Sequence, residues 1–197
     1  MSFHRISVKY PIAEAGALDL DKVILVFHQW IQQSAVPGRL MDVADYRHMT
    51  DGPSVLLVGH DRDYGIDLSD GKMSVFHTLK RDVPDSVGDA LAVVFHGALT
   101  AMKTLEKDES VKLRGVTDQA TLLIQDRLRA ENSAKGLDIV RADVERVVKA
   151  IYGGAAATIS RDDGDARRCL TVSIAVKDAL DAAALAKNAE ALVPVKT

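Results

Sequence analysis

The sequence is poor in the residues that form covalent or metal cross-links. Among its 197 residues there is one cysteine, Cys169. A single cysteine excludes an internal disulfide and any zinc site built from several cysteine ligands. It is also typical of proteins kept in a reducing compartment. We therefore expect a cytoplasmic location.

Long apolar runs are missing as well. The most apolar stretches, 23–27 and 90–95, are far shorter than the roughly 18 to 20 residues that cross a bilayer. The first ten residues alternate polar and apolar side chains, unlike the apolar segment of a signal peptide. We therefore expect no export and no membrane partner.

Charge of one sign is not concentrated anywhere. The 25 basic and 28 acidic residues give a net charge of −3 without long runs of like charge. Because a nucleic-acid-binding surface needs a clustered cationic patch, no nucleic-acid partner is expected. The hydrophobic fraction of 47% is that of an ordinary globular protein, and the length suits a single domain.

Signatures of the common enzyme classes are also lacking. The sequence contains no Gly-rich phosphate loop that ends in Lys-Ser/Thr and no Gly-x-Gly-x-x-Gly turn. It likewise has no Gly-x-Ser-x-Gly elbow and no His-Glu-x-x-His pair. These absences argue against the usual nucleotide-binding and hydrolase classes, and the sequence points to no particular cofactor.

Hydrophobic periodicity is the strongest signal that is present. Strands are predicted at 3–10, 40–49, 55–60, 64–68, 73–79, 113–116, 121–126, 157–161 and 168–176, and helices at 20–33, 82–105, 133–152 and 179–192. Because hairpins and helices are mixed, we expect an α+β fold: a largely antiparallel sheet with a four-strand meander, packed by about four helices. The prediction is one domain over 1–197, in which 178–197 is a C-terminal helix that can be loosely attached.

The two halves of the predicted order resemble each other. Each contains a helix followed by a hairpin, which is compatible with a diverged internal duplication. No residue-level repeat supports that interpretation.

Several turn and helix positions carry a specific expectation. Asp70-Gly71 is typical of a two-residue type I′ turn, which would pair Tyr64 with His77 on one face of the sheet. Gly97 lies inside the second helix, where glycine costs about 1 kcal/mol relative to alanine. A close contact with a neighbouring helix or strand would explain that cost.

The densest group of polar side chains lies in the meander, between 42 and 64. A histidine held by a carboxylate can act as a general acid or base, and the same residue types can ligate a divalent metal. The candidate catalytic residues are Asp45, His48, His60, Asp63, Tyr64 and His77, and the candidate metal ligands are His48, His60 and Asp63.

The expected hairpin geometry separates the two histidines of this group. A hairpin closed over 50–54 would place His48 opposite Leu56 and His60 opposite Ala44, with the rings roughly 13 Å apart. One site using both rings would need a bulge or a third element. The alternative is that these are polar residues at loop ends.

The predicted Tyr64–His77 pair also has two interpretations. A phenol and an imidazole on one sheet face can share a hydrogen bond and exchange a proton. Because apolar residues flank both, the other interpretation is a core histidine whose polar atoms are satisfied.

Two functions are therefore compatible with the sequence. The first is a soluble cytoplasmic protein that acts through self-association or partner binding without catalysis. The expected form is a homo-oligomer, most simply a dimer. Amphipathic helices with wide apolar faces favour this function. The alternative is a small-molecule-binding protein or enzyme with a His/Asp site in the 42–64 meander, with or without a metal. The ligand is not indicated in either case.

Overall fold

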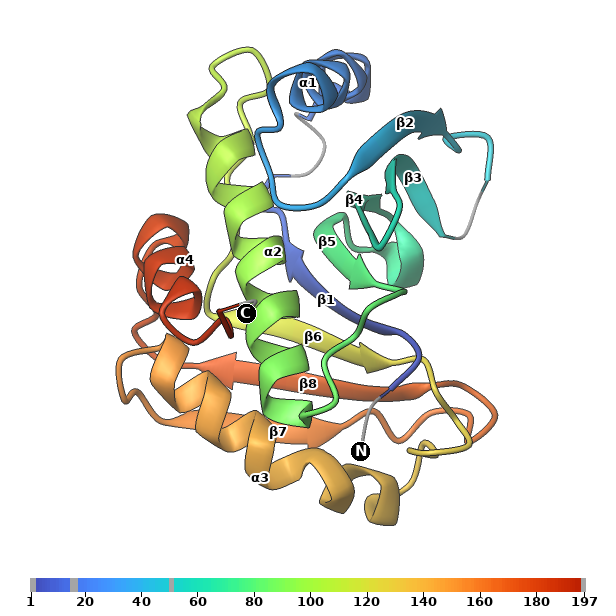
Figure 1. Cartoon of the computed structure of the whole chain (residues 1–197), viewed down its shortest axis with the longest axis vertical. Helices are drawn as coiled ribbons and strands as arrows, with labels where there is room; N and C mark the ends of the chain where they lie inside the picture. Colours follow the sequence, from blue (N-terminus) through green and yellow to red (C-terminus); the bar gives the residue numbers. More distant parts are fainter. Residues whose placement is uncertain (1–2, 15–17, 50–51, 196–197) are drawn as a thin grey trace.

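A computed structural model of the chain describes residues 3–14, 18–49 and 52–195 (Figure 1). The strands form one eight-stranded antiparallel sheet in the order β2-β3-β4-β5-β1-β6-β8-β7. They are β1 (Ile6–Pro11), β2 (Leu40–Asp45), β3 (Pro53–Gly59), β4 (Arg62–Asp67), β5 (Ser74–Leu79), β6 (Gln119–Ile124), β7 (Ala157–Arg161) and β8 (Leu170–Val176). The helices are α1 (Leu20–Gln33), α2 (Val87–Lys107), α3 (Ala134–Ile151) and α4 (Ala182–Glu190). The predicted α+β class, the meander β2–β5 and the number of helices are confirmed for this part of the chain.

Strands β1 and β6 are antiparallel neighbours near the middle of the sheet. Each is followed by a helix that leads to an outer strand, β2 or β7, and the next strands return toward the centre. A further helix, α2 or α4, then follows. The internal duplication compatible with this order stays a prediction.

The helices and the hydrophobic core lie on one face of the sheet (Figure 1). On β1, the buried side chains of Ile6, Val8 and Tyr10 point to this covered face, as strand alternation requires. The intervening set, such as Ser7 and Lys9, points to the other face. We call that other side the open face, because its strand residues lie outside the main hydrophobic cluster.

Helix α2 is the centre of the helical layer. It contacts β1, β5, α3 and α4, and most of its side chains are buried. Helix α4 lies against it through four residues that are at most 1% exposed. These residues are Ala182, Leu185, Ala186 and Ala189. Among the described helices, none is long and apolar enough to cross a membrane.

Several predicted elements differ from the structure. The second helix begins at Val87, not at 82, and β2 ends at Asp45, not at 49. Residues 113–116 do not form a strand, and Gly115 makes only an isolated bridge to Ile12. The last helix begins at Ala182, not at 179, because the carboxylate of Asp181 accepts the N–H of Ala184 at 2.8 Å.

The register of β4 and β5 is the predicted one, but the turn is not. Tyr64 pairs with His77 as expected. A 3-10 turn over Ser69–Gly71 replaces the two-residue type I′ turn. The Ser69 hydroxyl donates to the Asp67 carboxylate, and Lys9 Nζ binds Ser69 at 2.6 Å, so side chains hold the wider connection in place.

The register of β2 and β3 differs from the prediction. Ala44 lies opposite Leu56, not opposite His60. The reason is local, because the Asp45 carboxylate accepts the backbone N–H of Arg47 at 3.0 Å and turns the chain there. The predicted closure over 50–54 includes residues 50 and 51, which lie outside the described residues.

Candidate functional site

The structure places the predicted site residues in separate environments. Asp45 and His48 lie at the outer end of β2, and His60 lies in the turn between β3 and β4. Asp63 points to the open face. Tyr64 and His77 point to the covered face, where neither is accessible to solvent. Within the described ranges, no three His, Cys, Asp or Glu side chains are positioned to hold a metal ion together.

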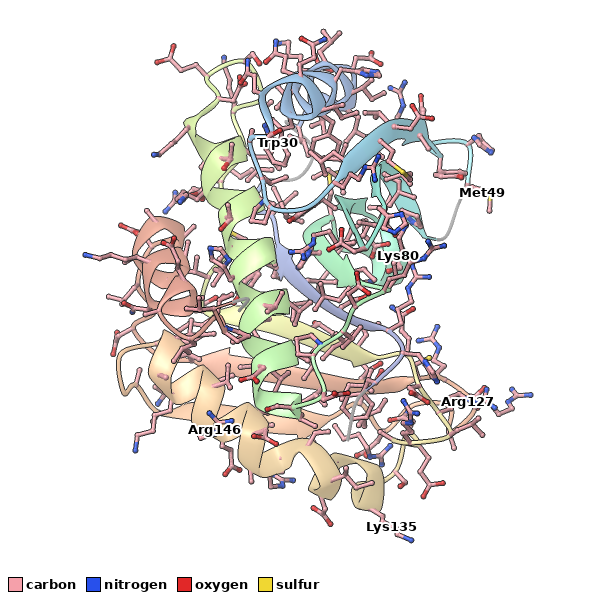
Figure 2. All side chains as sticks on the ribbon, in the orientation of Figure 1. Trp30, Met49, Lys80, Arg127, Lys135 and Arg146 are labelled. Atoms are coloured by element: carbon pink, nitrogen blue, oxygen red, sulfur yellow. The ribbon has the colours of Figure 1, made fainter. Side chains whose placement is uncertain are left out.

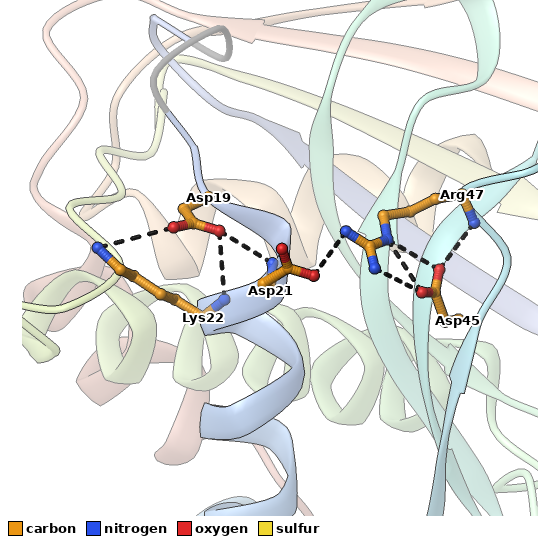
Figure 3. A network of polar contacts seen from close by, with 5 residues as sticks. All are labelled: Asp19, Asp21, Lys22, Asp45 and Arg47. Carbon is orange, nitrogen blue, oxygen red and sulfur yellow. Dashed lines mark hydrogen bonds and ion pairs between the residues drawn. The ribbon is translucent and has the colours of Figure 1, made fainter.

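Asp45 belongs to an ion-pair network that joins β2 to α1 (Figure 3). Arg47 Nη2 lies 2.6 Å from Asp45 Oδ2, and Arg47 Nη1 lies 2.8 Å from Asp21 Oδ1. Hydrogen bonds from Arg47 lower the pKa of Asp45 to about 2. A carboxylate held in this way is a poor general base near neutral pH. Arg47 links it at the surface to Asp21 of α1.

The two surface histidines, His48 and His60, lie in different surroundings. The ring of His48 lies 6.2 Å from that of Tyr46, at an exposed position. His60 is also exposed, and its backbone N–H donates to the Arg39 carbonyl at 2.8 Å. Figure 2 shows Met49, next to His48, at the outer tip of its loop.

Tyr64 and His77 form a stacked pair in the core. Their ring centroids are 4.5 Å apart at an interplanar angle of 23°. The Tyr64 hydroxyl donates to the Pro37 carbonyl at 2.6 Å, and His77 Nδ1 lies 2.9 Å from the Val94 carbonyl. The rings are therefore stacked, and the Tyr64 hydroxyl and His77 Nδ1 bond to different backbone groups.

Burial decides the charge of His77. Desolvation lowers the pKa of this imidazole to about 3. The ring is therefore neutral near pH 7, and Nδ1 carries the proton that it donates to Val94. Its other nitrogen, Nε2, is buried and has no hydrogen-bond partner in the described structure.

The open face carries two buried carboxylates on β4. Asp63 accepts hydrogen bonds from Lys80 Nζ at 2.7 Å and from the Gly59 N–H at 3.2 Å, and Figure 2 labels Lys80 beside the meander. Asp67 pairs with Lys9 Nζ at 2.5 Å. Both carboxylates are thus satisfied by cations that lie over the sheet.

The middle of the open face is polar and internally bonded. The hydroxyls of Ser7 and Thr78 are 2.7 Å apart, and Gln125 Nε2 donates to Ser7 Oγ at 2.8 Å. Toward β4, the Phe76 ring covers the place where a Cβ on Gly65 would lie. These cross-strand contacts fix the arrangement of the face without a covering helix.

A hollow of about 500 Å³ opens on the same face. Its floor is formed by β1, β6 and β8, and its walls are the β4–β5 connection and the β7–β8 turn. Residues that line it include Lys9, Lys72, Thr121, Leu123, Arg168 and Cys169. This volume falls within the range of about 300 to 1,000 Å³ that is usual for small-molecule pockets.

The two outer strands of the sheet differ in how they are protected. Strand β2 has a bulge between Leu40 and Asp42, and it exposes Met41, Asp42 and Asp45. Bulges and charged side chains are devices that keep a sheet edge from pairing with another chain. The register of β7 with β8 is regular, and the exposed side chains of β7 are those of Thr158 and Ser160.

The hollow and the β7 edge were not among the predicted sites. The sequence did contain a signal for the hollow, since Thr171 and Ser173 alternate with apolar residues and mark a polar outward face on β8. Which strand lies at the edge depends on the complete strand order, which local patterns do not determine.

Fold and site together define an α+β protein with one covered and one open sheet face. No family model matches the chain, and no curated protein matches it.

Proposed function

We propose that the chain is a cytoplasmic protein that acts by association, without catalysis, and that its working form is a homodimer. The observation that carries this proposal is the outer strand β7, which has a regular register and no charged side chain among its first four residues. An edge of this kind readily accepts another strand.

The state of the polar residues agrees with a non-catalytic role. Asp45 is held by Arg47, and Asp63 is held by Lys80. His77 is neutral and enclosed in the core. The separation of His48, His60 and Asp63 offers no support for the metal-dependent alternative.

Sizing of the full chain tests the homodimer. Size-exclusion chromatography with light scattering should give twice the mass of the chain at concentrations around 100 µM, with dissociation on dilution. A mass equal to one chain at every concentration would contradict the proposal.

The hollow favours a second function, the binding of a small anionic molecule. Lys72 borders it, as does Lys9, whose ammonium is also paired with Asp67. Thr121 and Gln125 offer hydrogen-bonding groups, and Leu123 offers an apolar surface. A ligand with one anionic group and an apolar body matches this lining.

A fluorescent probe can test this second function. 8-Anilinonaphthalene-1-sulfonate has a sulfonate and an aromatic body, and saturable fluorescence enhancement is expected. The variant Thr121→Phe should fill the hollow and remove the enhancement, whereas Ser160→Phe on the outer strand should leave it unchanged. Equal enhancement in both variants would rule out this location.

A further inference from the structure

We infer that the second copy of the chain binds along β7, strand to strand and antiparallel, with the two-fold axis at Ile159. The result would be a continuous sixteen-stranded sheet. This inference rests on the homodimer proposed above and adds the surface and the register.

The backbone of β7 has free groups at alternate residues. Asp162 N–H donates to the Thr171 carbonyl of β8 at 2.9 Å. In an antiparallel pair, successive residues direct their N–H and C=O groups to opposite sides. The groups of Thr158 and Ser160 therefore face β8, and those of Ala157, Ile159 and Arg161 face outward.

A two-fold axis at Ile159 uses all of these outward groups. It places Ile159 opposite its own copy and Ala157 opposite Arg161, so roughly six backbone hydrogen bonds can form. Moving the axis to Thr158 or Ser160 keeps the pairing geometry but leaves part of the five-residue strand unpaired. The register centred on Ile159 therefore has the largest overlap.

The side chains of β7 are compatible with this register on both faces. On the open face, Thr158 meets Ser160 of the other copy, and both are exposed hydroxyl residues. On the covered face, the half-buried Ile159 meets its own copy. Hydroxyl pairs and apolar pairs of this kind stabilise neighbouring strands.

The charges beside the strand do not oppose this register. Arg161 lies opposite the uncharged Ala157 in this register, and its guanidinium is already bound to Asp163 and to the Asn132 carbonyl. Glu145 and Lys149 of α3 border a shallow groove beside β7.

The open-face contact between residues 158 and 160 permits a charge test of the register. In Thr158→Lys/Ser160→Lys, each introduced ammonium would face another across the axis. In Thr158→Glu/Ser160→Lys, each introduced carboxylate would face an ammonium. Because both positions are exposed, neither variant should alter the fold, which circular dichroism and thermal melting would verify.

The expected result is a difference in dimer dissociation measured by sedimentation at about 0.1 M salt. The two-lysine variant should raise the Kd about tenfold, and the Glu/Lys variant should keep it at or below the wild-type value. The matched control is Ser173→Lys/Ala175→Lys, which adds the same charge to the same face on β8, one strand inward. It should leave the Kd within a factor of about two, because salt screens charges beyond about 10 Å.

Each other outcome overturns a defined part of the proposal. If the wild-type chain is a dimer and the two-lysine variant dissociates with the same Kd, β7 is excluded as the interface and the homodimer remains. Weakening by both β7 variants would exclude the register centred on Ile159. A monomeric wild-type chain would overturn the homodimer and this interface together.

Discussion

The imidazole of His77 occupies the space that a side chain on Gly97 would need. A Cβ built on Gly97 would lie 2.3 Å from both Cε1 and Nδ1 of His77. The same ring stacks on Tyr64 and bonds to the Val94 carbonyl. One histidine thus fixes the distance between the meander and the central helix α2, and the contact expected at Gly97 is present.

Replacing Gly97 by alanine should therefore destabilise the protein. Alanine favours a helix by about 1 kcal/mol over glycine, but crowding a packed core typically costs about 1 to 3 kcal/mol. Crowding should prevail, because the His77 ring is held by Tyr64 and Val94 and has little room to move. Urea unfolding should show a net loss of about 1 kcal/mol.

Gly88 supplies the control in the same helix. A Cβ there would meet the tip of Arg146, a long and largely exposed side chain on α3 that Figure 2 labels. Such a side chain can move aside at little cost, so Gly88→Ala should be neutral or slightly stabilising. If Gly97→Ala were also stabilising, the contact with His77 would not be a rigid one.

The low pKa of His77 should make stability depend on pH. An unfolded histidine takes up a proton near pH 6.5, whereas the buried ring stays neutral down to about 3. Between these values the unfolded state binds one more proton, so stability falls as the pH falls. The charges that act on the ring are those of Arg62, His96 and Asp61.

Comparison with His77→Gln isolates this contribution. Glutamine loses the stacking on Tyr64, so the variant should be less stable than the wild type at about pH 8. Because glutamine does not titrate, the difference should shrink by about 2 kcal/mol between about pH 8 and about pH 5. A pH-independent gap for His77→Gln would mean that the pKa of the ring is the same in the folded and unfolded states.

The periodicity of the sequence predicted most elements because the core lies on one face of each. Helix α1 begins and ends at the predicted residues, since Asp19 caps it and its apolar stripe is continuous. Strand β7 also has the predicted bounds. The segment 113–116 has the composition of a strand but forms only an isolated bridge and two backbone hydrogen bonds with residues 11–13. Tertiary context therefore removed an element that local propensity favoured.

The location of the polar sites was harder to predict. Asp63 and Tyr64 are adjacent in sequence, but strand alternation sends one to the open face and the other into the core. The four-residue error in the β2–β3 register came from an Asx turn at Asp45. The hollow combines residues from β1, β6 and β8, which are far apart in sequence, and no local pattern shows that they meet.

The two aspartates of the polar segment should differ in their importance for stability. Asp63 is buried and binds Lys80 and the Gly59 N–H. Asp63→Asn leaves the cation without its partner and should cost about 2 kcal/mol of unfolding free energy. Asp45→Asn removes an exposed ion pair and should have little effect in the same urea experiment. Equal losses would show that the exposed network in Figure 3 stabilises as strongly as the buried one.

The single thiol reports on the hollow. Cys169 is half-buried and lies in the wall of the hollow. We expect iodoacetamide at neutral pH to modify the native protein several-fold more slowly than the chain unfolded in guanidinium, because the fold restricts access to the sulfur.

Saturating 8-anilinonaphthalene-1-sulfonate should slow the native reaction further, since it would occupy the space beside Cys169. This protection should be absent in Thr121→Phe and present in Ser160→Phe. Labelling as fast as in the unfolded chain would show instead that Cys169 is fully accessible, and protection that survives in Thr121→Phe would place the probe elsewhere.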